Sequence, residues 1–278
     1  MKLYIDQIKP KLGNRAYNLE TMLQVIDRAI DEKNEVVVFP ELSLTGHSLE
    51  DIAFEVGIDK VPQELLEKSK EIDIIFGAVE IGEEDYPYNT AYYLSEGKVL
   101  GKHRKVYLSD YGYSTESRCF MKGNSFDVIE TKFGKIGILL GDEIYHQSAQ
   151  YILAQKGVKY LFNLINGVGT LKGDKENVGS NTKLVAKANS VMNGIFTIVA
   201  NRAGVEDGLA FYGNSFVVSP DGNICIEGEY FKEGNITCNL DEGEIRRART
   251  KYPFFKSEDR RLTVCEVLSL EKKSKWIC

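Results

Sequence analysis

The sequence has few cysteines, and their placement excludes several kinds of protein. The five cysteines in 278 residues are widely spaced and form no CxxC pair. This pattern argues against a zinc ribbon and against a thioredoxin-type redox site. It also argues against a disulfide framework, because a chain of this length can bury a large core without such links. We therefore expect a reducing, cytoplasmic setting.

Long apolar runs and long basic runs are missing too. No stretch of 18 apolar residues occurs, and the residues after Met1 lack the apolar region of a signal peptide, so we expect no membrane association. The formal net charge is −6. The most basic stretch, residues 102–105, is too short to bind a phosphate backbone. Nucleic acid is therefore not an expected partner.

The composition that remains is that of an ordinary globular protein, 43% hydrophobic and 27% charged. No linker, repeat or low-complexity segment interrupts it, which predicts a single domain over residues 1–278. Apolar residues at helical spacing predict helices over residues 14–33, 62–71, 143–156, 181–193 and 242–251. Short apolar or alternating runs predict strands over residues 35–39, 72–79, 90–94, 98–108, 126–130, 135–140, 158–164, 195–201, 211–219, 223–227 and 236–240. Beyond Pro253 there is little periodicity. Helices mixed with hairpins and buried strands indicate an α/β fold of layered sheets flanked by helices.

The clearest local motif is a carboxylate that follows a buried strand. Three valines and a phenylalanine, residues 36–39, lead to Pro40 and then to Glu41. Strand ends in α/β sheets are where ligands bind. An apolar environment raises the pKa of a carboxyl group, which suits Glu41 to act as a general base.

Three further positions have residue types that chemistry could use. Lys105 lies near the end of a predicted strand, and alternation turns it to the same face as His103. Glu116 lies in a polar loop. Gly141 ends an apolar strand shortly before a predicted helix, and strand–turn–helix is the geometry of a nucleophile elbow. Here the elbow position has no side chain.

Taken together, these motifs resemble the nitrilase (carbon–nitrogen hydrolase) superfamily. The stretch FPELSLTG at residues 39–46 is a near-complete match to the family's base motif, and residues 213–216 and 219–222 resemble its late hairpin. The resemblance implies a four-layer α-β-β-α sandwich. It is nearest to the glutamine-amidase domain of NAD synthetases and related amidases. Because the chain has no Ser-Gly-Gly pyrophosphatase loop, we expect no synthetase activity from it.

The resemblance also implies roles for particular residues. Glu41 would be the general base, Lys105 the oxyanion stabiliser and Glu116 the second glutamate, with Gly141 at the position of the missing cysteine nucleophile. The implied substrate-binding residues are Asp142, Tyr111 and Asn166. Glu41 and Lys105 are expected to pair across the pocket and to keep each other ionised. No cofactor is implied, and the three histidines lack metal-ligand spacing, so no metal is expected.

Glycine at position 141 cannot form a thioester. The sequence therefore favours a nitrilase-like protein that does not hydrolyse and that binds a small amide, amine or carboxylic acid. One alternative is an active amidohydrolase that works through a cysteine thioester and whose native cysteine at position 141 was substituted. Another is a non-catalytic structural or assembly protein, whose pocket would be filled by large side chains.

Two groups could replace the missing thiol. Cys119 lies three residues after Glu116, and a water molecule activated by Glu41 could occupy the space of the sulfur. Members of the family pair through outer helices, so we also expect a homo-oligomer, a dimer or larger. Residues 254–278 would form a tail that reaches the partner.

Overall fold

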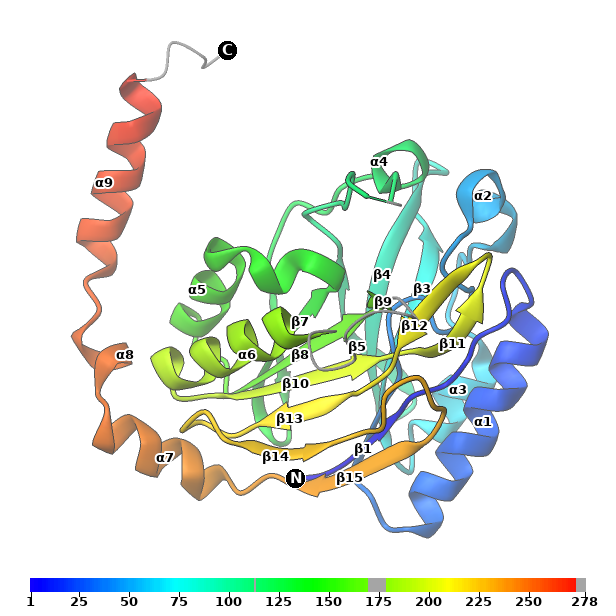
Figure 1. Ribbon diagram of the computed structural model, residues 1–278, viewed down its shortest axis with the longest axis horizontal. Helices are drawn as coiled ribbons and strands as arrows, with labels where there is room; N and C mark the ends of the chain where they lie inside the picture. Colours follow the sequence, from blue (N-terminus) through cyan, green and yellow to red (C-terminus); the bar gives the residue numbers. More distant parts are fainter. Residues whose placement is uncertain (113, 170–178, 274–278) are drawn as a thin grey trace.

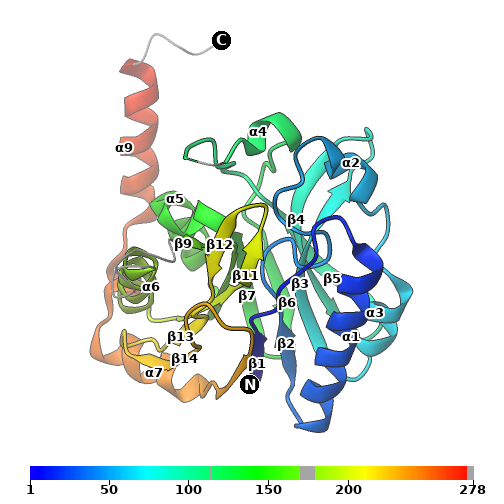
Figure 2. The same cartoon turned by 45° about the vertical axis from the view of Figure 1, so that its right-hand side comes forward.

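The computed structural model of the protein describes residues 1–112, 114–169 and 179–273. Two six-stranded sheets pack face to face with helices outside each (Figure 1, Figure 2). The first sheet has the order β15 (Asn235–Asn239), β1 (Lys2–Asp6), β2 (Val36–Val38), β3 (Asp73–Ile81), β4 (Pro87–Ser95) and β5 (Lys98–Arg104). The second has the order β14 (Ile224–Glu227), β13 (Phe216–Val218), β10 (Phe196–Asn201), β8 (Tyr160–Ile165), β7 (Gly134–Leu140) and β6 (Val128–Thr131). The expected four-layer α-β-β-α sandwich is confirmed.

Helices form the two outer layers and the C-terminal segment. The α-helices are α1 (Arg15–Asp31), α2 (Ala53–Val56), α3 (Gln63–Lys68), α4 (Glu116–Cys119), α5 (Gln147–Gln155), α6 (Ser180–Asn193), α7 (Glu242–Lys251), α8 (Phe254–Ser257) and α9 (Arg260–Lys273). Two short 3₁₀ turns, η1 (Glu50–Ile52) and η2 (Gly141–Tyr145), accompany them. Helices α1 and α3 lie outside the first sheet, and α5 and α6 lie outside the second (Figure 2).

Helix α1 shows how the sequence builds an outer layer. The side chain of Asn14 accepts a hydrogen bond from the backbone N–H of Tyr17, which caps the helix where the sequence predicted its start. The buried face repeats at helical spacing and packs on the outer side of the first sheet. That face consists of Met22, Val25, Ile26 and Ala29.

The core between the sheets follows from strand alternation. Ile136, Ile138 and Leu140 of β7 point toward the first sheet, whereas Leu139 points outward to α5. From the first sheet, the same core receives Leu3, Ile5, Val36, Val38, Ile75 and Tyr93. The two sheets are therefore held together by apolar side chains along their length, and both present their strand ends to the pocket described below.

The predicted strand over residues 211–219 is two strands in different sheets. Its first part belongs to β12 (Leu209–Tyr212), which pairs with β11 (Ala203–Glu206) and β9 (Val168–Gly169) in a small third sheet. Its second part is β13. The break falls at Gly213 and Asn214, both with positive φ, a conformation that strand residues do not adopt.

Two other regions differ in secondary structure from the prediction, and β5 ends at Arg104 rather than at residue 108. The helix expected over residues 143–156 begins only at Gln147, because residues 141–145 form the 3₁₀ turn η2. Beyond Pro253, where little periodicity was found, the chain forms α8 and α9. The apolar residues of α9 do not lie on one narrow stripe, so the helical pattern was weak.

Within the described part of the chain, no helix is long and apolar enough to cross a membrane.

Candidate functional site

Glu41 lies just after β2 at a sharp turn over the neighbouring strand β3. Leu42, the next residue, has a φ of +49°. A Cβ atom at Gly77 of β3 would lie 2.3 Å from the backbone nitrogen of Leu42, so only glycine leaves room for this turn. The turn directs the Glu41 side chain inward, where it is 2% exposed.

Lys105 binds both of the predicted glutamates. It follows the last residue of β5, and its backbone N–H donates to the carbonyl of Asn89 on β4. Its Nζ donates to Glu41 Oε1 at 3.1 Å and to Glu116 Oε1 at 2.8 Å. The Asn89 amide nitrogen also donates to Glu41 Oε1, at 2.8 Å. The sequence therefore identified a true cluster but missed Asn89 as part of it.

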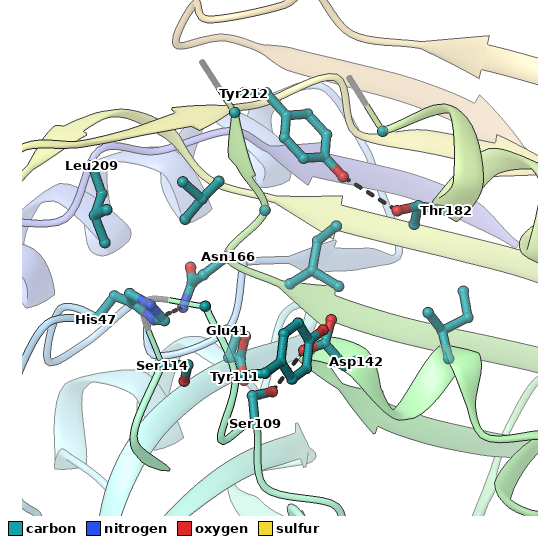
Figure 3. Close-up of a pocket in the computed structure, with 18 of the residues that line it drawn as sticks. Glu41, His47, Ser109, Tyr111, Ser114, Asp142, Asn166, Thr182, Leu209 and Tyr212 are labelled. Carbon is teal, nitrogen blue, oxygen red and sulfur yellow. Dashed lines mark hydrogen bonds between the residues drawn. The ribbon is translucent and has the colours of Figure 1, made fainter. Parts of the chain in front are cut away.

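Glu116 connects this cluster to the pocket mouth. It is the first residue of α4 rather than a loop residue, and its Oε2 accepts the backbone N–H of Ser109 at 2.7 Å. The Ser109 hydroxyl donates to Asp142 Oδ2 at 2.7 Å. Burial and the neighbouring Asp142 raise the pKa of the Tyr111 hydroxyl, and Figure 3 shows Ser109, Tyr111 and Asp142 on one side of Glu41.

Burial controls the protonation of the cluster. It raises the pKa of Glu41 above its usual value, and the charge of Lys105 offsets only part of that rise. The pKa of Glu116 is raised for the same reason. Burial alone would lower the pKa of Lys105, but the two carboxylates outweigh it and raise that pKa. The lysine therefore stays protonated. Glu41 and Lys105 pair across the pocket as expected, although desolvation has a larger effect on the pKa of Glu41 than the lysine charge has.

Gly141 stands at the predicted elbow, between β7 and η2, with a φ of +51°. A Cβ atom built there would lie 2.5 Å from Lys105 Nζ and 3.2 Å from Glu41 Oε1. Position 141 therefore faces both charged groups of the cluster. Because glycine has no side chain, the lysine ammonium occupies part of the space that a side chain would need.

Glu143 connects the elbow at Gly141 to the segment that follows β5 and contains Lys105. Its Oε2 accepts the backbone N–H of Leu140 at 2.8 Å and lies 2.7 Å from His103 Nε2. Its Oε1 accepts the backbone N–H of Val106 at 2.7 Å. Burial would raise the pKa of Glu143, but the histidine and these N–H donors lower it. Its side chain thus ties Gly141 and Lys105 into one rigid unit, a role that no sequence pattern indicated.

All seven residues predicted from the sequence line one cavity of about 870 Å³. They are Glu41, Lys105, Tyr111, Glu116, Gly141, Asp142 and Asn166. The glycine-rich residues 167–169 also line it. On the side of Glu41 away from Asp142, Asn166 meets His47, a histidine that the sequence had given no role (Figure 3).

Cys119 does not face this cavity. It lines a smaller neighbouring cavity of about 250 Å³ that lies beside Glu116. Burial raises the pKa of its thiol, which keeps it from the reactive thiolate form. Cys119 is therefore not placed to replace a nucleophile at position 141. Among the described residues, no group of three or more histidines, cysteines or carboxylates could hold a metal ion.

Two packed sheets that present a buried Glu–Lys–Glu cluster to a strand–turn–helix elbow define a nitrilase-type protein. The carbon–nitrogen hydrolase family model matches residues 5–250, and the chain belongs to this family.

Relatives include both glutamine-dependent NAD(+) synthetases and nitrilases. A glutamine-dependent NAD(+) synthetase from Acinetobacter baylyi is 28% identical over 84% of this chain, and the chain spans only 42% of that protein. A probable nitrilase from Schizosaccharomyces pombe is 29% identical, with 91% of this chain and 93% of the relative covered. The solved structure of Nit3 from Saccharomyces cerevisiae, a member of the nitrilase superfamily, matches with a TM-score of 0.81 at 25% identity and covers 94% of this chain and 96% of its own.

Proposed function

We propose that this protein binds a small amide, amine or carboxylic acid without hydrolysing it. The proposal rests on one observation. Gly141 places no side chain at the elbow, in a cavity where Glu41, Lys105 and Glu116 remain hydrogen-bonded. Acyl transfer by this family requires a nucleophile that attacks the carbonyl carbon, and glycine supplies none.

The persistence of the cavity supports binding over a purely structural role. A structural protein would gain stability by filling such a space with large side chains. Instead, about 870 Å³ remains open beside three hydrogen-bonded charged groups. Burying Glu41 and Lys105 costs desolvation free energy. Their retention in the cavity is therefore better explained by contact with a ligand than by a contribution to stability.

The charge of the lining favours a neutral amide or a protonated amine over a carboxylate. The described lining residues include three carboxylates, Glu41, Glu116 and Asp142, and one basic side chain, Lys105. Lys105 already binds two of the three. Among the described residues, no basic side chain pairs with Asp142, which accepts a hydrogen bond from the Ser109 hydroxyl, so it would attract a protonated amino group.

Binding and turnover can be measured separately on the purified protein. We expect titration calorimetry with propionamide and L-glutamine to detect binding, while ammonia release stays at the level of a protein-free control. Glu41→Gln should change the binding heat, whereas Glu130→Gln, an exposed glutamate on β6, should not. Ammonia release that Glu41→Gln abolishes would overturn the proposal. A protein that binds neither propionamide nor L-glutamine would overturn it as well.

We also propose that the protein self-associates through its C-terminal helix. Helix α9 stands away from the two sheets (Figure 1, Figure 2) and leaves apolar side chains at least half exposed. These are Leu262, Val264, Val267, Leu268 and Leu270. An isolated helix of this length is marginal in water, and a second copy of the chain would cover these side chains.

Sedimentation of the full chain tests the association. We expect the unchanged protein to sediment as a dimer or larger, and Leu262→Glu to shift it toward the monomer because burying a charge at an interface is unfavourable. Arg261→Gln, on the same helix, is the matched control and should leave the sedimentation unchanged. A monomeric unchanged protein would contradict the proposal.

A further inference from the structure

His47 forms the wall of the cavity on the side away from Asp142. Its ring Nδ1 accepts a hydrogen bond from the side-chain nitrogen of Asn166 at 3.1 Å. Its edge packs against Phe211 of β12, with ring centroids 5.4 Å apart at an interplanar angle of 81°. Figure 3 shows His47 and Asn166 pointing toward one another beside Glu41. The imidazole is therefore fixed in orientation by two neighbours.

A buried ion pair fixes the backbone of this histidine as well. Glu206 Oε1 accepts the backbone N–H groups of His47 at 2.9 Å and of Ser48 at 2.8 Å. Glu206 Oε2 in turn accepts from Arg202 Nη1 at 2.9 Å. Arg202 is 1% exposed and Glu206 is 7% exposed. This pair reaches across from the end of β10 and from β11, so the position of His47 is determined by rigid elements rather than by its own loop.

The hydrogen bond from Asn166 determines what His47 offers to the cavity. Because Nδ1 accepts, the proton of the neutral ring is on Nε2. Burial lowers the pKa of His47 to about 4, so the ring is neutral near pH 7. No hydrogen bond of Nε2 to another described residue is present. Nε2–H is thus an uncharged donor on a residue that lines the cavity.

We propose that His47 is a specificity-determining residue that binds a neutral carbonyl oxygen of the ligand and discriminates against a carboxylate at the same place. This inference rests on the proposed binding function and specifies the ligand class further. The ligand would have a protonated amino group for Asp142 and, on the same carbon atom, an uncharged amide for His47, so that the α-carboxylate of a free amino acid would meet His47. A neutral imidazole cannot offset the charge of a carboxylate in a cavity whose described lining already contains three carboxylates and one lysine.

L-Glutamine and L-glutaminamide form a matched pair of probes, because they differ only by one carboxylate replaced with a carboxamide. We expect calorimetry to show that the protein binds L-glutaminamide about ten-fold more tightly than L-glutamine. His47→Phe keeps a ring against Phe211 but removes the donor. In this variant the preference should disappear, so that the ratio of the two affinities is about one. His47→Gln retains a neutral donor and should retain most of the preference.

His146→Phe is the control, since His146 lies outside the cavity and stacks on Tyr107. It should leave the ratio of the two affinities unchanged. A general structural defect would weaken the binding of both compounds equally. Only the ratio of their affinities therefore measures the discrimination. Tighter binding of L-glutamine, an unchanged ratio in His47→Phe, or no binding of either probe would overturn the inference. Propionamide binding without turnover would still support the proposed function in each of these cases.

Discussion

Replacing Gly141 with cysteine should give the protein an amide-cleaving activity, which under the proposed function the unchanged chain lacks. The new Cβ would lie 3.2 Å from Glu41 Oε1 and 2.5 Å from Lys105 Nζ, so the thiol would stand beside both groups. The lysine ammonium must shift to make room, which the flexible end of this side chain allows. A cysteine at a φ of +51° adds strain of about 1 kcal/mol.

The chemistry follows from the groups already in place. Glu41, whose pKa burial raises, would take the proton of the thiol, and the thiolate would attack the amide carbon. Lys105 would stabilise the negative oxygen of the tetrahedral intermediate. Ammonia would leave, and water would then hydrolyse the thioester. We expect ammonia release from propionamide or L-glutamine, together with an acyl adduct on residue 141 in the mass spectrum.

Two variants separate the thiol from the strain of adding a side chain. Gly141→Ala introduces the same steric conflict with Lys105 but no sulfur, and it should release no ammonia. Adding Glu41→Gln to Gly141→Cys should lower the rate by about a hundred-fold or more. If folded Gly141→Cys released no ammonia from either amide, the loss of function would extend beyond the missing sulfur.

Replacing Lys105 with methionine should destabilise the protein by about 3–5 kcal/mol. Both Glu41 and Glu116 would remain in a buried site without their shared cation, and Lys105 itself is only 2% exposed. Carboxyl groups without a cation take up protons in the folded state, so folding stability falls as the pH rises. Urea unfolding should therefore show a smaller loss at about pH 5 than at about pH 8.

The neighbouring Lys102 provides the matched control. It also pairs with a buried carboxylate, Glu80, but its side chain is half-exposed and Arg104 binds the same carboxylate. Lys102→Met should therefore cost no more than about 1 kcal/mol. Combining Lys105→Met with Glu116→Gln should recover part of the loss, because one buried charge disappears. Equal effects at positions 102 and 105 would contradict the buried cluster.

The sequence predicted the layers because apolar periodicity is local. Helix α1 and strand β2 follow directly from the spacing of their apolar residues. The prediction from sequence was wrong where contacts with distant parts of the chain determine the local secondary structure. The turn η2 replaces a helical turn because Glu143 bonds to residues some 40 positions earlier in the chain. The division of residues 211–219 between two sheets depends on the positive φ of Asn214. Asparagine also occurs in many other conformations, so its presence alone does not predict a break.

The candidate site could be predicted as a set of residues, but its internal contacts could not. The motifs around Glu41, Lys105 and Gly141 match a family pattern, and the structure brings these residues together. The sequence assigned no role to Asn89, Glu143 or His47. Each acts through a partner that is at least 36 residues away. Gly77 is a further case, since its need for glycine is visible only beside the turn at Leu42.

The pairing of β1 with β15 affects how the protein is made. Strand β1 lies near the start of the chain, and its antiparallel neighbour comes from residues 235–239. During synthesis, this side of β1 therefore stays unpaired until residues 235–239 have left the ribosome. An open edge of this kind invites pairing with other nascent chains. Yield in cells should thus depend on how quickly the residues between β1 and β15 are translated and on chaperones that cover that edge.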